Sequence, residues 1–156
     1  IVHASWMVAA FEIAGVVGMV AAGWATDRFF GGRGPRTCAV CMTMTALFVF
    51  LFWWLPSPSI WLATALLMGA GFFIYGPQAL IGISAANLAT KRAAATASGF
   101  TGIFGYLSTI VSGWGLGWIA HHRGWDAVLM TMLGAAAIGL LMFICIWREK
   151  PHGYET

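Results

Sequence analysis

Residues 60–88 read I-W-L-A-T-A-L-L-M-G-A-G-F-F-I-Y-G-P-Q-A-L-I-G-I-S-A-A-N-L, a long run without a charged side chain. A helix needs about 20 apolar residues to cross the hydrocarbon core of a bilayer, and this run exceeds that length. The sequence therefore predicts a transmembrane helix here. Pro77 within the run lacks a backbone N–H and crowds the preceding helical turn, which predicts a kink.

Four further apolar runs flank this one, two on each side. They cover about residues 6–25, 37–55, 97–120 and 127–147. All are continuous, whereas the strands of a membrane barrel alternate between polar and apolar residues. Of the 156 residues, 60% are hydrophobic and 8% are charged, while a soluble domain carries about 25% charged residues. The predicted fold class is all-α: a polytopic transmembrane helical bundle with five spans.

The basic residues fall almost entirely on one side of this bundle. Short polar connections lie at residues 27–36, at the Pro56–Ser59 turn and at residues 121–126. If the five runs alternate in direction, one side receives all but one of the Lys and Arg residues, namely Arg28, Arg33, Arg36, Lys91, Arg92, Arg148 and Lys150. The other side holds Arg123. Because basic residues concentrate in cytoplasmic loops, we expect an external N-terminus and a cytoplasmic C-terminus.

Small residues recur at the spacing that permits close helix contact. The pairs are Gly113/Gly117, Ala14/Gly18 and Ala135/Gly139. In lipid such spacing lets helix backbones approach each other, so we expect these pairs at helix–helix contacts. The cysteines, Cys38, Cys41 and Cys145, are expected to act as small buried hydrophobic residues, with no metal site and no redox role.

Glu12 is the one acidic side chain inside a predicted span. A carboxylate within the bilayer is costly and marks a functional site, a partner or a solute pathway. Alternatively, Glu12 lies near the membrane surface and is solvated. Tyr75, Gln78 and Tyr106 are further polar positions within the spans. Each either contacts a solute in a cavity or bonds a neighbouring helix.

Asp27, Arg28, Arg33 and Arg36 form a compact charge cluster at the end of the first span. Part of this cluster anchors the topology. The sharper hypothesis is a gate, in which Asp27 pairs with a basic residue or a neighbouring helix N-terminus in one state and releases it in another. No catalytic motif occurs in the sequence, so neither an enzyme nor a cofactor nor a nucleic-acid partner is predicted.

Two stretches resemble a known transporter family. G-W-A-T-D-R-F-F-G-G-R-G-P-R, from Gly23 to Arg36, is similar to the loop signature of the major facilitator superfamily, with one extra residue after Arg28. F-I-Y-G-P-Q-A-L-I-G-I-S-A-A-N-L-A-T-K-R-A-A-A-T-A-S-G-F-T-G-I-F-G-Y-L, residues 73–107, resembles the organophosphate:phosphate antiporter family. The likeness implies that residues 1–156 form a partial C-terminal six-helix bundle, the last five spans of a twelve-helix transporter in the plasma (inner) membrane.

The resemblance also implies roles for individual residues. Members of the family carry an acidic residue where Glu12 stands and tyrosines where Tyr75 and Tyr106 stand, so these are expected to line the cavity. The family holds substrate phosphate with one Arg from each half, and both would lie outside this chain. Asn87 departs from the pattern, because relatives tend to have Glu there.

The function that follows is secondary transport of an organic phosphate ester in exchange for inorganic phosphate, by alternating access. Glycerol phosphate, phosphoglycerate and hexose phosphate all remain open as substrates. The expected partners are that ester, inorganic phosphate, the lipid bilayer and the missing N-terminal half of the transporter. A membrane sensor of hexose phosphate that signals to a kinase is the alternative, and a helical membrane protein without transport activity is a third possibility.

The charge distribution gives a testable topology. Reporters that distinguish the two sides of the membrane are fused after Thr156 and within Pro56–Ser59. We expect the first to report the cytoplasm and the second the exterior, because the basic residues lie on the side of Thr156. An external reporter at Thr156 would contradict this orientation.

Overall fold

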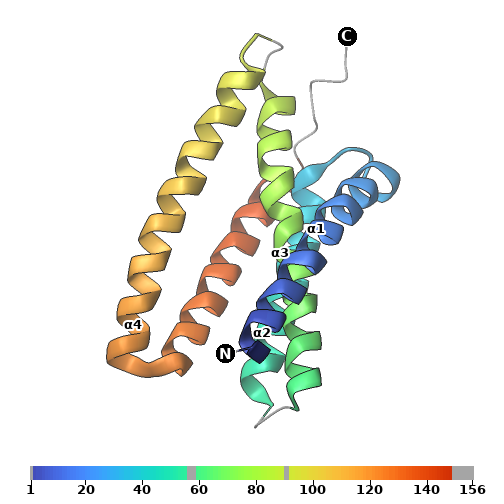
Figure 1. The fold of residues 1–156 in the computed structure, drawn as a ribbon. Coiled ribbons are helices and arrows are strands. Elements are labelled where there is room, and N and C mark those ends of the chain that lie inside the picture. The colour runs from blue at the N-terminus through green and yellow to red at the C-terminus, as the bar shows by residue number, and fades with distance from the viewer. Residues whose placement is uncertain (1, 56–58, 90–91, 149–156) are drawn as a thin grey trace.

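The computed structural model describes residues 2–55, 59–89 and 92–148, and these residues form helices and short connections without a strand (Figure 1). The helices are α1 (Val2–Phe29), α2 (Gly34–Trp54), α3 (Ile60–Leu88) and α4 (Ala94–Cys145). Each is long and apolar enough to cross a membrane. The predicted all-α transmembrane class is therefore confirmed.

Helix α3 lies at the centre of the bundle and contacts the other three helices, with α1 and α2 as its main neighbours. It remains one continuous helix through Pro77. The small core draws on every helix: Ala22, Cys38, Cys41 and Leu80 are buried, and Phe73 and Phe143 pack against them. Cys38 and Cys41 thus serve as small apolar residues, as expected. Cys145 is exposed, which corrects its expected burial.

Helix α4 consists of two arms that meet at Gly124, where φ is 81° and ψ is 175°. A straight helix of its 52 residues would extend about 78 Å, more than twice the roughly 30 Å hydrocarbon core. Figure 1 shows α4 turning back on itself instead, so that residues 94–123 and 125–145 run in opposite directions. The described part of the chain thus has four helices where five spans were predicted, because the last two predicted spans are the two arms of α4.

The chain turns within the connection predicted over residues 121–126, but the turn is confined to Gly124 and most of that segment is helical. Backbone groups inside a bilayer have no water to bond, so extending helical hydrogen bonds to the turn itself is favourable. The polar segment predicted over residues 27–36 is likewise mostly helical. Helix α1 continues to Phe29, and α2 begins at Gly34.

Local chemistry explains this first connection. The carbonyl oxygen of Thr26 accepts hydrogen bonds from the backbone N–H of Phe30 (3.2 Å) and of Gly32 (3.0 Å). Gly31 and Gly32 have φ values of 58° and 77°, the left-handed conformation in which helices commonly end. Pro35 then occupies the first turn of α2, where its missing N–H costs nothing.

The chain runs up and down, so that the α1–α2 and α3–α4 connections and the last residues of α4 lie at one end of the bundle (Figure 1). Five of the six described arginines lie at that end: Arg28, Arg33, Arg36, Arg92 and Arg148. Arg123 lies at the other end, beside Gly124. Lys91 and Lys150 fall outside the described residues. The charge asymmetry is therefore present, while the assignment of this end to the cytoplasm stays a prediction.

The small-residue pairs divide into two groups. A Cβ atom on Gly18 would lie 1.9 Å from the carbonyl oxygen of Phe72, and one on Gly139 would lie 3.0 Å from Met42 Cε. These glycines do sit at helix contacts. Gly113 and Gly117 have no atom within 4 Å of such a Cβ, so their predicted contact is wrong for the described part of the chain. The reason is that the first arm of α4 carries no buried residue.

Gly124 should be sensitive to substitution. Its backbone conformation is accessible almost only to glycine, and strain of this kind costs about 1–3 kcal/mol. We expect Gly124→Ala to lower the free energy of unfolding by that amount. The measurement is thermal unfolding of the complete protein in detergent.

Gly134→Ala is the matched control for Gly124→Ala. Gly134 lies in the helical second arm, and a Cβ there would meet no atom within 4 Å. Alanine inside a helix is more stable than glycine by about 0.5–1 kcal/mol, so this variant should unfold at an equal or higher temperature. Equal loss of stability in both variants would contradict the role given to Gly124.

Candidate functional site

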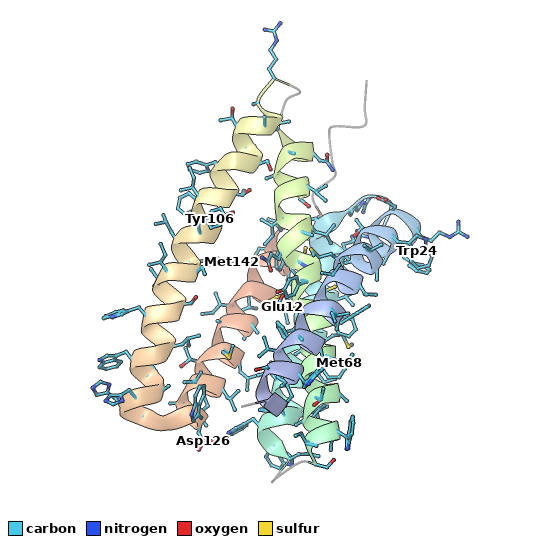
Figure 2. The ribbon with its side chains drawn as sticks, in the orientation of Figure 1. Glu12, Trp24, Met68, Tyr106, Asp126 and Met142 are labelled. Atoms are coloured by element: carbon cyan, nitrogen blue, oxygen red, sulfur yellow. The ribbon has the colours of Figure 1, made fainter. Side chains whose placement is uncertain are left out.

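Glu12 lies well inside α1 and not at its end (Figure 2). Its Cα is about 15 Å along the axis from the helix start at Val2, and about 22 Å from Asp27 near the other end. Both residues belong to the apolar segment Ser5–Phe29 that is long enough to cross a membrane. The structure therefore favours the mid-span position for Glu12 over the alternative of a solvated position near the surface.

The partner of Glu12 is Tyr75 on α3. The Tyr75 hydroxyl donates a hydrogen bond to Glu12 Oε2. The Tyr75 ring also meets the Phe11 ring edge to face, with centroids 5.9 Å apart and planes at 70°. A carboxylate and a phenol from adjacent helices are thus joined midway along the two helices, at an exposed position. Tyr75 bonds a neighbouring helix, which was one of the two roles open for it.

Glycines permit this close approach of α1 and α3. A Cβ atom on Gly15 would lie 2.6 Å from the Tyr75 ring, and one on Gly71 would lie 2.6 Å from the Phe11 carbonyl oxygen. Neither position could hold a larger residue without moving Tyr75 or Phe11. Sequence reasoning missed Gly15. Its signal was its place three residues after Glu12, on the same face of the helix.

The other two predicted cavity residues differ in their placement. Gln78 is exposed and follows Tyr75 by three residues on α3, so the two share a helix face. Tyr106 is 79% exposed on the first arm of α4. Figure 2 places it away from Glu12, with no contact between them. The structure thus brings together Glu12 and Tyr75, with Gln78 one turn on, and leaves Tyr106 apart.

A basic partner for Glu12 does not occur among the described residues. Every described arginine lies at a helix end or in a connection, and no ion pair within 4 Å involves Glu12 in residues 2–55, 59–89 and 92–148. The cluster therefore offers one carboxylate, one phenol and one amide. It can donate and accept hydrogen bonds, but it contributes no positive charge.

The charge cluster at the α1–α2 connection is only partly assembled. Asp27 and Arg28 are exposed in the last turn of α1, and Asp27 makes no ion pair within the described residues. Arg33 precedes the first turn of α2 without a side-chain capping bond. Gly23 has open space around its Cα, because a Cβ atom there would have no other atom within 4 Å.

Arg36 contacts Trp147, just beyond the end of α4. Its Nε donates to the carbonyl oxygen of Trp147 at 3.3 Å, and its guanidinium carbon lies 5.5 Å from the centroid of the Trp147 ring. Arg36 is therefore not the basic partner of Asp27 in this conformation. The gate role of the cluster stays a prediction.

This architecture of long apolar helices, with one carboxylate bonded to a neighbouring helix, is that of a polytopic membrane protein. The profile of the Major Facilitator Superfamily matches residues 2–156. The chain belongs to the major facilitator superfamily.

Several curated relatives indicate which family within the superfamily this chain resembles most. The chain is 41% identical to a "Probable hexose phosphate transport protein" of Chlamydia pneumoniae, over 99% of this chain and 34% of that protein. It is 35% identical to a "Glycerol-3-phosphate transporter" of Haemophilus influenzae, over 94% of this chain and 34% of that one. These descriptions match the organophosphate:phosphate antiporter family, the family that the sequence resembles.

A third relative carries a different description. The chain is 38% identical to a "Membrane sensor protein UhpC" of Salmonella typhimurium, over 92% of this chain and 33% of that protein. In all three comparisons the chain spans about a third of the length of the relative.

Gly15→Ala tests the packing that joins Tyr75 to Glu12. The added methyl group would overlap the Tyr75 ring, and overpacking of this kind costs about 1–3 kcal/mol. We expect a lower unfolding temperature for the complete protein. Because the ring must move, Tyr75→Phe should have little further effect in the Gly15→Ala background.

Gly23→Ala is the control on the same helix, since no atom lies within 4 Å of its Cβ position. It should unfold at or above the temperature of the unsubstituted protein. A full additional effect of Tyr75→Phe in the Gly15→Ala background would show that Gly15 does not position Tyr75.

Proposed function

We propose that this chain is part of a secondary transporter that exchanges an organic phosphate ester for inorganic phosphate by alternating access. The observation that carries the proposal is the hydrogen bond between Tyr75 and Glu12 in the middle of two adjacent membrane helices. Relatives described as transporters of hexose phosphate and of glycerol-3-phosphate support the substrate class. A further relative is described as a "Hexose-6-phosphate:phosphate antiporter".

Residues 1–156 would form the last five helices of a twelve-helix transporter. Substrate sites of such proteins lie near the bilayer midplane, at the interface of two structural repeats. Glu12, Tyr75 and Gln78 would form one wall of that site. The remaining helices would supply the other wall and the basic residues, because a phosphate group needs positive charge that this wall lacks.

Tyr75 has one hydroxyl proton, so it can donate a hydrogen bond either to Glu12 or to a substrate, but not to both. While Tyr75 donates to Glu12, that proton is not available to a substrate. When a phosphate oxygen accepts it instead, Glu12 loses its partner on α3 and becomes free to pair with a basic residue of the other half. Substrate binding would thereby exchange one set of contacts for another and shift the balance between two arrangements of the helices.

A hexose-phosphate sensor is the second candidate function. The observation in its favour is the similarity to the membrane sensor protein UhpC. A sensor would use the same wall to bind its ligand, so the Glu12–Tyr75 pair does not separate the two functions. The difference lies in whether the ligand crosses the membrane.

Counterflow in proteoliposomes separates the two functions. The complete protein is reconstituted with internal phosphate, and labelled glycerol-3-phosphate, 3-phosphoglycerate and glucose-6-phosphate are added outside in turn. Uptake that depends on internal phosphate supports exchange. Saturable binding of an ester without uptake would support the sensor and contradict transport. The 156-residue chain alone should give no uptake, because it would supply only one wall.

Glu12→Gln should impair exchange in the complete protein. The amide keeps the volume and a hydrogen-bond acceptor for Tyr75, but it removes the charge that would pair with the other half. We expect exchange to fall at least tenfold, with membrane insertion unchanged or improved. The measurement is initial exchange rate per inserted molecule.

Ile13→Leu, next to Glu12 on an exposed face of α1, is the control and should keep the normal rate. An unchanged rate in correctly inserted Glu12→Gln protein would mean that Glu12 is a tolerated polar residue.

A further inference from the structure

The second arm of α4 is held to α2 by a polar contact at each end. At one end, Trp53 Nε1 donates to Asp126 Oδ1 at 3.3 Å. At the other, Arg36 donates to the carbonyl oxygen of Trp147 at 3.3 Å. Between these contacts Gly139 lies against Met42 of α2. The contact between the two helices therefore extends along most of the arm.

The Arg36 contact lies just beyond the C-terminal end of α4, whose last helical residue is Cys145. The last carbonyl groups of a helix have no partner within the helix. Two of them are used by the backbone: Ile146 N bonds Met142 O at 3.4 Å, and Trp147 N bonds Ile144 O at 3.2 Å. Arg36 bonds the carbonyl oxygen of Trp147, in the turn that follows the last helical residue, and so holds this turn from another helix.

Charge and stacking add to this hydrogen bond. A cation at the C-terminal end of a helix is stabilised by the helix dipole. The Arg36 guanidinium also lies over the Trp147 indole, at a distance where a cation–π interaction is favourable. One side chain thus makes two different contacts with the same residue, 111 positions away in the sequence.

The other two arginines of the α1–α2 connection behave differently. Arg28 is exposed in the last turn of α1, and Arg33 lies before the first turn of α2. No hydrogen bond, ion pair or ring contact involves either side chain within the described residues. The three arginines look alike in sequence, yet only one of them is engaged with a distant helix.

We propose that Arg36 is a positioning residue that holds the turn after α4 and so fixes the end of α4 to the start of α2. Arg28 and Arg33 are then the arginines of the connection that are left for the predicted gate. The first arm of α4 is joined to this fixed pair through Gly124. This assignment concerns helix packing and holds whichever ester the protein carries.

Hydrogen exchange at the end of α4 tests the proposal in the complete protein. Arg36→Ala removes a bond from a charged donor, so we expect amide exchange in residues 144–148 to accelerate about tenfold. Exchange in residues 125–130, at the far end of the arm, should not change. Arg33→Ala removes the same charge three residues away and should leave both segments unchanged.

Two further variants separate the contacts that Arg36 makes. Arg36→Lys keeps the charge but loses the planar fork, so it should give an intermediate acceleration. Trp147→Ala keeps the carbonyl acceptor and loses the ring, and it should also be intermediate. Because both substitutions break the same contact, Arg36→Ala combined with Trp147→Ala should exceed Arg36→Ala alone by less than the sum of the two single effects.

Asp27→Asn distinguishes this contact from the gate. It should leave exchange at the end of α4 unchanged, alone or combined with Arg36→Ala. Equal acceleration in Arg33→Ala and Arg36→Ala would overturn the proposal, because the effect would then be one of charge alone. Non-additivity between Asp27→Asn and Arg36→Ala would also overturn it. If Arg36→Ala fails to fold, Arg36→Lys and Trp147→Ala test the proposal instead. Acceleration at residues 144–148 in both, without acceleration in Arg33→Ala, would support it, and equal exchange in all three would overturn it.

Discussion

The close approach of α1 to α3 is the contact on which the candidate site depends. Gly18 brings α1 to within contact of the Phe72 backbone, and Gly15 leaves room for the Tyr75 ring. Only at this separation can the short Glu12 side chain reach the Tyr75 hydroxyl. In lipid no hydrophobic force drives helices together, so such packing and a polar bond between helices provide the attraction. The same contact thus stabilises the bundle and positions its polar residues.

The lengths of the apolar runs allowed the sequence to predict most of the helices. Helix α3 has the bounds expected for it, because Ser59 caps its start and an uninterrupted apolar run follows. The boundaries at residues 27–36 and 121–126 were drawn at charged residues, and there the helices extend further than predicted. Charged side chains at a helix end reach water without breaking the helix, so polarity alone does not mark where a helix stops.

Pairing between distant segments was beyond sequence reasoning. Glu12 and Tyr75 were each recognised as polar residues within spans, but their bond depends on the register of two helices 63 positions apart. Arg36 was assigned to the gate because it belongs to the same short charge cluster as Asp27. Its actual partner, Trp147, becomes visible only when α4 turns back at Gly124 and returns to the start of α2.

The separation of charge along the helices constrains how this chain could handle a phosphate ester. Its described cations lie at helix ends, in connections or beside the turn at Gly124, and among the described residues the only mid-span charge is the carboxylate of Glu12. A doubly charged phosphate beside that carboxylate alone would be repelled, and the repulsion is strong where water is excluded. Under the proposed function, positive charge from the remaining helices must therefore meet Glu12 and the phosphate in the same space. Competition between those two anions for one cation would then link the state of the Tyr75–Glu12 bond to the presence of substrate.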